Sequence, residues 1–492
     1  MHLLKLSGKR TERKIGEVPY FKQDQSTCLT CALSFSLFCR AVDEKGDRKW
    51  IMYCSFFQQV DNLVWGAPLL VLLVGTGIYL TLRLGLLQIR YLPKAFRLIF
   101  TEDEGHGDIS SFGALATALA ATVGTGNIVG VATAIQTGGP GALFWMWMAA
   151  FFGMATKYAE GLLAIRYRTK DDNGHISGGP MYYILHGMGE KWRPLAIFFA
   201  VAGVLVALFG IGTMTQVNSI TGSLQASFGT APEVASVVIA LVVSTIIFGG
   251  IHWISKVSEK VVPFMAAAYI FATVTIIALH LDQLLPALKA VFSGAFTGTA
   301  AMGGFAGATV KMAIQKGVAR GVFSNESGLG SAPIAAAAAK SNEPVEQGLI
   351  SMTGTFIDTI IICSLTGLSL LVSGEWMAKG STSTLTQDTF TGVFGPVGGI
   401  ILTLCLVLFA TTTILGWSYY GERCFEFLFG VKHINLYRTF FVFMVGLGGF
   451  LKLDLVWVIA DIVNGLMALP NLIALLALSP VIIKESKQYF KK

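Results

Sequence analysis

Apolar residues recur along this chain in runs long enough to span a bilayer, for example over Leu63–Leu82. About 20 apolar residues cross the hydrocarbon core as a helix. Backbone N–H and C=O groups find no water inside lipid, so helices are the default spanning element. The pattern therefore predicts an all-α membrane protein of about eleven transmembrane helices, over residues 62–83, 112–136, 142–165, 195–222, 233–250, 261–281, 298–317, 346–373, 396–421, 438–451 and 454–480.

Charged residues are scarce and unevenly placed. They make up 13% of the 492 residues, whereas a soluble protein carries about a quarter. The net charge of +7 does not point to nucleic acid, because Lys and Arg of membrane proteins gather in cytoplasmic loops. Here they gather in every second loop, beginning after residue 83, and in the C-terminal tail. This alternation places those loops and the C-terminus in the cytoplasm.

Two of the predicted spans are interrupted by glycine. The first carries ATVGTGNIVG (121–130) and the second AAMGGFAG (300–307), and each begins a block of five spans. Glycine inside a helix costs about 1 kcal/mol relative to alanine, so such clusters mark unwinding or very close helix packing. Broken helices in corresponding positions of two halves are typical of secondary transporters. We predict two repeats, over residues 112–281 and 298–480.

An unwound segment at the first interruption would offer two kinds of backbone group. Amides at the start of the following half-helix hold a carboxylate without a positive side chain. Carbonyls of the preceding half-helix suit a hard cation such as Na⁺, and Thr122, Thr125 and Asn127 add oxygen ligands. Neither interruption contains Asp or Glu, so a zwitterion with a monovalent cation fits better than a divalent metal.

A third stretch, FATTT (409–413), places hydroxyls in an apolar span. Such hydroxyls commonly bond a carbonyl one turn back in their own helix. Alternatively they complete an oxygen cage for Na⁺ with the carbonyls of the first interruption.

Three long stretches carry a family resemblance. Residues 111–161, residues 317–339 (GVARGVFSNESGLGSAPIAAAAA) and residues 408–422 (LFATTTILGWSYYGE) resemble the alanine/glycine:cation symporter family. The likeness covers roughly residues 60–485. It implies the five-plus-five inverted repeat of the neurotransmitter:sodium symporters, with one extra N-terminal helix at 62–83. It also implies a bacterial or archaeal protein that takes up alanine and glycine with Na⁺, or sometimes H⁺.

The resemblance also assigns site residues. The V-G-x-G-N of the wider group matches residues 123–127, whose amides would take the substrate carboxylate, and carbonyls near 303–307 would take its ammonium. The implied substrate-binding residues are Ala121, Thr122, Gly124, Thr125, Gly126, Asn127, Gly303, Gly304, Phe305 and Gly307. The implied sodium ligands are Ala120, Val123, Phe409, Thr412 and Thr413. In some relatives, Thr122 and Asn127 would line a second cation position.

Charged residues also lie within or near the spans, and intramembrane charges are functional candidates because they are costly. They are Lys157, Glu160, Lys311, Asp358 and Asp461. Lys157 and Glu160 are three residues apart on one helix face, which predicts a simple ion pair.

The first 55 residues form a basic extension whose apolar stretch, Leu29–Phe38, is too short for a span. Relatives begin shortly before the residues that match Val64–Pro68. We predict that residues 1–51 are not part of the functional protein and that translation starts at Met52. The alternative is an additional cytoplasmic or re-entrant domain. Residues 56–484 form the predicted transporter domain, and 485–492 form a cytoplasmic tail.

The sequence as a whole predicts a secondary active symporter of the inner membrane. It would import alanine or glycine with sodium by alternating access, as a monomer, without a cofactor, a nucleic-acid partner or enzymatic activity. Two alternatives stay open, a proton-coupled amino-acid transporter and a non-transporting receptor of the same fold.

Overall fold

The computed structural model describes residues 56–57, 59–101, 105–297, 309–377, 382–450 and 454–491. The extension at 1–55 and the predicted substrate residues Gly303, Gly304, Phe305 and Gly307 lie outside these ranges. The regular structure of the described ranges is helical, apart from one short hairpin of β1 (Thr169–Lys170) and β2 (Ile176–Ser177) and a bridge between Ile109 and Ala339. The predicted all-α membrane fold is therefore confirmed.

Six helices of the described ranges are long and apolar enough to cross a membrane. They run over Gln59–Arg83, Glu190–Phe228, Gly250–Leu279, Pro344–Ser373, Pro396–Phe429 and Val458–Ala477. A bent pair, Ser111–Thr122 with Gly126–Gly138, makes a seventh when it is taken as one span. The predicted spans at 142–165, 233–250 and 438–451 correspond to helices that are shorter or more polar, and much of the one at 298–317 lies outside the described residues.

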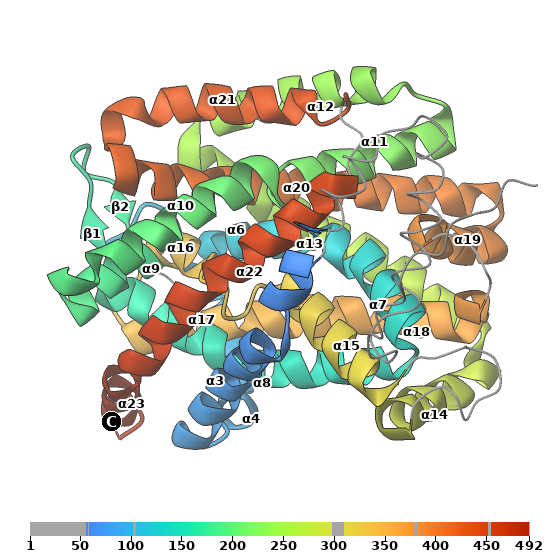
Figure 1. The fold of residues 1–492 in the computed structure, drawn as a ribbon, viewed down its shortest axis with the longest axis horizontal. Helices are drawn as coiled ribbons and strands as arrows, with labels where there is room; N and C mark the ends of the chain where they lie inside the picture. The colour runs from blue at the N-terminus through green and yellow to red at the C-terminus, as the bar shows by residue number, and fades with distance from the viewer. Residues whose placement is uncertain are drawn as a thin grey trace, which may run out of the picture. The chain divides into compact units, whose positions relative to one another are not determined.

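The elements follow one another in the order drawn in Figure 1. Before the hairpin lie α3 (Ala67–Arg83), α4 (Leu87–Arg90), α5 (Leu92–Leu98), α6 (Ser111–Thr122), η1 (Gly126–Gly130), α7 (Val131–Gly138) and α8 (Gly141–Arg166). After it come α9 (Pro180–Tyr183), η2 (Ile184–Met188), η3 (Glu190–Trp192), α10 (Arg193–Phe209), α11 (Met214–Phe228), α12 (Pro232–Ile247), α13 (Gly250–Leu279) and α14 (Leu281–Thr297).

The remaining elements complete the chain. They are α15 (Val310–Asn325), α16 (Ala332–Ala337), α17 (Pro344–Thr355), η5 (Phe356–Cys363), α18 (Ser364–Ser373), η6 (Glu375–Met377), α19 (Thr382–Phe394), α20 (Pro396–Phe429), η7 (Val431–His433), α21 (Ile434–Leu447), α22 (Asp454–Ala477) and α23 (Ser479–Tyr489). Helix α23 continues into the predicted tail, so residues 485–489 are helical.

The first predicted interruption is a real break in the helix. Helix α6 begins at Ser111, is capped by Ser110, whose hydroxyl accepts a bond from the Gly113 amide at 2.9 Å, and ends at Thr122. Val123 is extended (ψ 92°), and the chain resumes as the π-helical turn η1 and then α7. The two halves meet at an angle of 54°.

A further break lies between α15 and α16, whereas the interruption that the sequence predicts at 300–307 lies outside the described residues. Glu326, Gly328 and Gly330 all adopt positive φ, which ends α15 and turns the chain before α16. A side chain at Gly330 would lie 2.6 Å from Pro180 Cγ and 2.9 Å from Asn471 Cγ, so only glycine fits there. Unlike the two interruptions that the sequence predicts, this break contains an acidic residue, Glu326.

Helix α8 is the central helix of the described residues and packs against α15 and α17. Glycines make this close approach possible. A Cβ at Gly348 would lie 2.7 Å from the Tyr158 carbonyl oxygen, and one at Gly317 would clash with the Ala142 carbonyl. Small residues at helix contacts let backbones approach closely where the surrounding lipid supplies no hydrophobic driving force.

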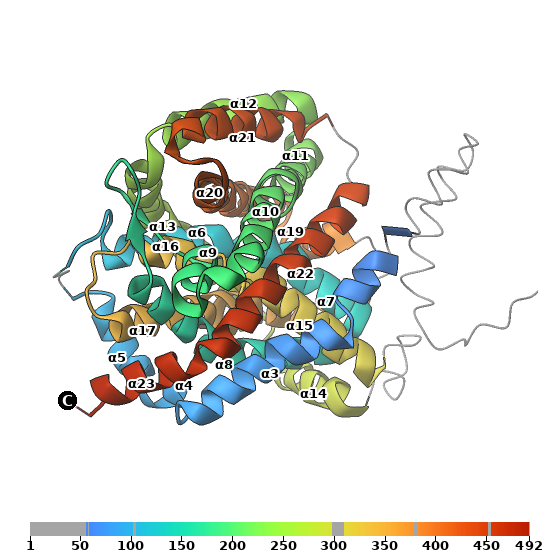
Figure 2. The same cartoon turned by 60° about the vertical axis from the view of Figure 1, so that its left-hand side comes forward.

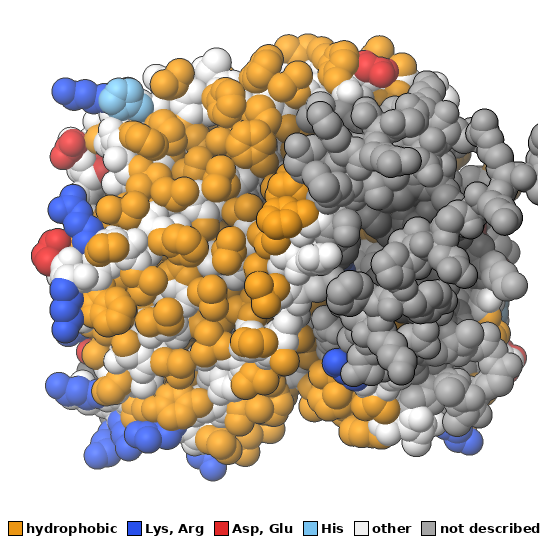
Figure 3. Space-filling view, viewed as in Figure 1, with side chains coloured by type: hydrophobic (Ala, Val, Ile, Leu, Met, Phe, Trp, Pro, Cys, Tyr) orange, Lys and Arg blue, Asp and Glu red, His pale blue; other side chains and the backbone are white. Residues whose placement is uncertain are grey.

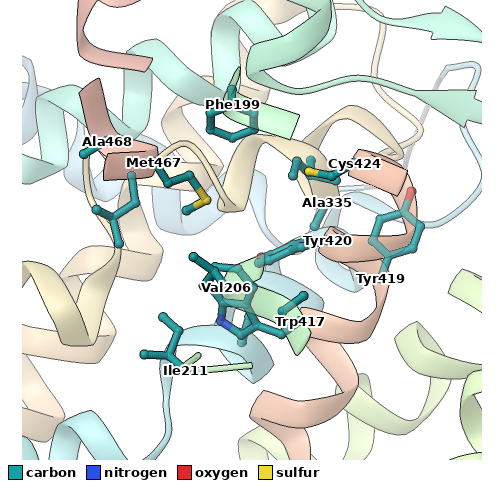
Figure 4. Packing of buried hydrophobic residues seen from close by; sticks show 14 of the residues in the cluster. Phe199, Val206, Ile211, Ala335, Trp417, Tyr419, Tyr420, Cys424, Met467 and Ala468 are labelled. Atoms are coloured by element: carbon teal, nitrogen blue, oxygen red, sulfur yellow. The ribbon is translucent and has the colours of Figure 1, made fainter. Parts of the chain in front are cut away.

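A cluster of buried apolar side chains joins α20 to its neighbours. Trp417 and Tyr420 of α20 pack with Val206 of α10 and Ala335 of α16 (Figure 4).

The two broken helices are joined to each other at the hairpin end of the molecule. The Asp108 amide donates to the Ala338 carbonyl at 2.9 Å, and the Lys340 amide donates to the Ile109 carbonyl at 2.8 Å. Arg168 reinforces this junction, because its guanidinium donates to the carbonyls of His106, Ala337, Ala339 and Ser341 at 2.6–2.9 Å. One side chain thus fastens the start of α6, the end of α16 and the end of α8.

The surface separates into apolar and basic regions. Large apolar side chains stand exposed along α3, α12 and α13, among them Val71, Leu241 and Phe271. In Figure 3 apolar side chains cover the middle of the visible face, whereas Lys and Arg gather along its left and lower left edges. Figures 1 and 2 show the C-terminal residue beside α23, and Figure 1 places it on that same side.

We expect Arg168→Gln to lower the melting temperature of the purified protein by about 5 °C or more, because each hydrogen bond from a charged group contributes about 1.5–3 kcal/mol. The matched control is Arg166→Gln. Arg166 is 52% exposed and lies 3.7 Å from Glu485, and such surface pairs contribute about 0–1 kcal/mol. Equal melting of the two variants would contradict the assigned role of Arg168.

Candidate substrate and cation site

The two helix breaks meet in the interior. A Cβ built on Gly126 would lie 3.2 Å from Ser324 Cα and 3.3 Å from Phe323 Cδ1. Gly126 begins the second half of the first broken helix, and Phe323 and Ser324 end the first half of the second. The structure therefore brings a helix N-terminus and a helix C-terminus together, with opposite partial charges.

Backbone amides of the first break have partners on polar side chains. The Gly124 amide donates to Asn127 Oδ1 at 2.8 Å, and the Thr125 amide donates to Gln216 Oε1 at 3.4 Å. Gln216, on α11, is held by a bond from its Nε2 to the Ile211 carbonyl at 3.0 Å. The sequence analysis missed Gln216, although a glutamine inside a predicted span was a visible signal. Thr125 Oγ1 is buried without a hydrogen-bond partner in the described part of the chain.

The predicted sodium ligands lie around one contact between α6 and α20. Thr413 Oγ1 is 3.0 Å from the Phe409 carbonyl oxygen and 3.5 Å from the Val123 carbonyl oxygen, across the two helices. Thr412 Oγ1 is 2.9 Å from the Phe409 oxygen. Ala120 is buried in the same apolar cluster as Val123 and Phe409. Thr412 Oγ1 also lies 3.5 Å from Met265 Sδ. Hydroxyl and carbonyl oxygens of this kind suit a hard monovalent cation such as Na⁺.

The other two predicted substrate residues of α6 point to different neighbours. A Cβ on Gly416 of α20 would lie 2.7 Å from Ala121 Cβ, so Ala121 packs directly on α20. Thr122 donates back to the Ala118 carbonyl at 3.1 Å and lines a small internal cavity with Lys157.

Asp358 on η5 ties both breaks together. Its Oδ1 accepts from Asn127 Nδ2 at 2.7 Å, and its Oδ2 accepts from Ser324 at 2.9 Å and Thr359 at 2.7 Å. Asn127 belongs to the first broken helix and Ser324 to the second. The predicted functional importance of Asp358 thus has a structural counterpart, since its buried carboxylate contacts both.

The second break is held by two further buried carboxylates. Glu326 accepts from Trp417 Nε1 at 2.9 Å and from the Ser331 hydroxyl. Glu160 of α8 accepts from the Gly328 amide at 3.1 Å and from Asn471 Nδ2 at 2.7 Å. Glu160 therefore satisfies a backbone amide that the break leaves without a helical partner, whereas Glu326 bonds two side chains. Glu326 also escaped the sequence analysis, which took residues 318–345 for a loop.

Lys157 is the positive charge among these acids. It acts electrostatically on Glu160, Glu326 and Asp358. The predicted Lys157–Glu160 ion pair is wrong, because Lys157 Nζ, in a side chain only 3% exposed, has no hydrogen-bond partner in the described ranges. Its side chain lines a cavity of about 20 Å³ between α6, α8, α16 and α17, enough space for one water molecule.

An ion pair joins α15, the first half of the second broken helix, to α22 on the side of the breaks away from the hairpin. Arg320 Nη2 is 3.2 Å from Asp461 Oδ2, and the guanidinium lies 5.3 Å from the centre of the Phe323 ring. Asp461 is thus paired, whereas Lys311, the remaining charge that the sequence singles out, is exposed in the first turn of α15.

Two helices broken where they meet, with backbone termini at the breaks, are typical of a secondary transporter. Comparison with known proteins agrees. The model of the sodium:alanine symporter family matches residues 50–492, and the chain belongs to that family.

The chain is 52% identical over 446 residues to the sodium/alanine symporter AgcS of Methanococcus maripaludis, covering 89% of this chain and 97% of that protein. It is 56% identical over 441 residues to an uncharacterized transporter of Haemophilus influenzae, covering 89% and 96%. Among solved structures, MhsT in complex with L-phenylalanine matches at 13% identity with a TM-score of 0.56, covering 76% of this chain and 90% of that one. This last likeness concerns the fold alone.

We expect Lys157→Met to lower the melting temperature of the purified protein by about 5 °C or more, because leaving buried charges uncompensated costs about 3–5 kcal/mol. Lys311→Met removes an exposed lysine of a neighbouring helix and should melt with the wild type. Melting of both variants at the wild-type temperature would show that Lys157 does not stabilise the acidic residues around it.

Proposed function

We propose that this chain is a Na⁺-coupled symporter that imports small neutral amino acids, alanine and glycine in particular. Membership of the sodium:alanine symporter family and the resemblance to AgcS support this function. The observation that carries it is the Thr413 hydroxyl, which lies against the carbonyl of Val123, the residue where the first helix breaks.

In this proposal Na⁺ and substrate are linked through the backbone of the first break. A Cβ on Gly124 would clash with Thr413 Oγ1, so the break and the proposed cation ligand are in direct contact. Na⁺ bound to the Val123 carbonyl and the Thr413 hydroxyl would fix the orientation of residues 124–126. These carry the amides proposed to hold the carboxylate. Binding of either ligand then favours the other, by the same factor in both directions.

The substrate ammonium is proposed to lie at the C-terminal end of α15. The carbonyls that end a helix carry partial negative charge, and this end lies against Gly126. An amino acid between the breaks would then present its carboxylate to η1 and its ammonium to α15. Because Phe323 and Ser324 approach Gly126 closely, we expect the site to favour glycine and alanine over leucine.

Two sets of polar contacts, one on each side of the breaks, could close the site to either side of the membrane, as alternating access requires. On one side lies the Arg320–Asp461 pair, and on the other the start of α6 pairs with the end of α16 through Arg168. Basic side chains gather at the hairpin end, so we place that end and the C-terminus in the cytoplasm. The Arg320–Asp461 pair then faces outward. The two five-helix repeats correspond to α6–α13 and α15–α22.

Uptake into proteoliposomes tests this function. We expect an inward Na⁺ gradient to drive accumulation of labelled alanine, and we expect no accumulation when K⁺ replaces Na⁺ or when the gradient is collapsed. Gly126→Val should abolish accumulation, because its side chain would occupy the space between the breaks. Gly130→Val is the matched control, since a Cβ there would have no heavy atom within 4 Å.

Each alternative has its own outcome in this assay. Binding of alanine without accumulation would identify a receptor, and accumulation driven by a proton gradient without Na⁺ would identify a proton-coupled transporter. Equal uptake by the wild type and Gly126→Val would refute the assigned position of the substrate.

The cation site is tested by Thr413→Val, which removes one oxygen at nearly constant volume. We expect the Na⁺ concentration for half-maximal uptake to rise about tenfold or more, equivalent to about 1.4 kcal/mol. Thr411→Val is the control, because Thr411 directly precedes the proposed ligands Thr412 and Thr413 but is not itself a proposed ligand. An unchanged Na⁺ dependence of Thr413→Val would place the cation elsewhere.

A further inference from the structure

A basic pocket lies outside the transport site, between the end of α3 and the C-terminal helix α23. Its volume is about 390 Å³, within the usual range for small-molecule sites. It is lined by Tyr79, Arg83, Pro480, Ile483, Lys484, Lys487, Gln488 and Lys491. Four of these side chains are cationic and none is acidic.

Three of the four charges of this pocket come from α23 and the turn that follows it. Residues 484, 487, 488 and 491 follow helical spacing, so they form a single stripe. The opposite face is packed inward, where Tyr158 bonds Ser486 at 2.6 Å and Tyr489 donates to Glu346 at 2.7 Å. The helix is thereby held with its basic stripe outward, because its buried contacts fix its rotation.

Helix α3 completes the pocket and is itself fastened to α23. Tyr79 and Ser479 hydroxyls lie 3.2 Å apart, and the Arg83 guanidinium lies 5.8 Å from the centre of the Tyr79 ring. This places Arg83 opposite the lysine stripe, across the pocket.

The cations of the pocket are not neutralised within the described part of the chain. No acidic group there lies within 4 Å of Arg83, Lys484, Lys487 or Lys491. The nearest acid along the helix, Glu485, faces Arg166 at 3.7 Å instead. Like charges held together repel one another, so an anion in the pocket would relieve that repulsion.

The pocket begins where the apolar surface of α3 ends. Val71 and Leu82 on α3 are 70% and 71% exposed, as expected of side chains that face lipid in a membrane-spanning helix. Arg83 follows Leu82 directly. A lipid whose acyl chains lie along α3 would therefore have its headgroup at the basic stripe.

We propose that this pocket binds the headgroup of an anionic phospholipid, with its phosphate among Arg83 and the lysines of α23 and its acyl chains along α3. Basic pockets beside transmembrane helices at the cytoplasmic face commonly recognise such headgroups. A free phosphate shares the headgroup chemistry, but it would gain nothing from the apolar face of α3. The site is independent of the transport function proposed above.

Lipid titration of the purified full chain, followed by native mass spectrometry, tests the proposal. We expect tighter binding of phosphatidylglycerol than of phosphatidylcholine, by about tenfold or more. The triple variant Lys484→Gln, Lys487→Gln, Lys491→Gln should lose this preference, since each lysine near an anionic surface contributes on the order of a fivefold change in affinity. These side chains are exposed, so the variant should fold, which its melting temperature verifies.

The matched control is the triple variant Lys170→Gln, Lys191→Gln, Lys432→Gln, which removes the same charge from basic loops outside the pocket. It should keep the wild-type preference. The proposal is overturned if the pocket variant binds phosphatidylglycerol like the wild type, or if the control loses as much binding. Binding of inorganic phosphate to the wild type and to the pocket variant is measured as well. The lipid site is refuted if the wild type binds the two lipids equally. If, in addition, the wild type binds phosphate and the pocket variant does not, the pocket is a site for free phosphate.

Discussion

The structure depends on satisfying backbone groups where membrane helices break. A helix meets the hydrogen-bonding needs of its own backbone, and lipid offers no substitute when the helix stops, so each unmet group costs several kcal/mol. This protein meets the need with buried side chains. Asn127 accepts from the Gly124 amide, Glu160 accepts from the Gly328 amide, and Asn471 donates to the Gly328 carbonyl at 2.9 Å. The breaks can therefore persist inside the bundle as defined structures.

That solution brings charge into the interior. Glu160 satisfies a backbone amide of the second break, Glu326 lies within that break, and Asp358 orients Asn127, which satisfies the first. Carboxylates in such a place are tolerable when they are hydrogen-bonded and lie near a positive charge. Each accepts at least two hydrogen bonds, and Lys157 acts on all of them from α8. The lysine thus acts on the whole cluster of acids rather than on one partner, which explains why helical spacing alone gave the wrong pairing.

The two breaks differ in how visible they are in the sequence. Gly124, Gly126 and Asn127 interrupt an otherwise apolar run, so local composition was enough to predict the first break. The second break, at Asn325–Ser331, is polar and follows a basic segment, and by composition it resembles a solvent-exposed loop. Its residues are nevertheless at most 4% exposed, and this burial arises from packing against α8, α20 and α22. The sequence alone could not identify Gln216 as a partner of Thr125 either, because the two lie ninety-one residues apart and meet only in the folded chain.

Asp358 gives the two breaks a common attachment. Its carboxylate holds Asn127 of the first broken helix through one oxygen and Ser324 of the second through the other. It stands on η5, where the π-helical turn re-aims side chains relative to a regular helix. A rotation of either broken helix that lengthens one of these bonds leaves a buried polar group unsatisfied, unless η5 or the other break moves as well. The carboxylate therefore couples the positions of the two broken helices. This coupling is separate from the linkage that bound ligands would provide.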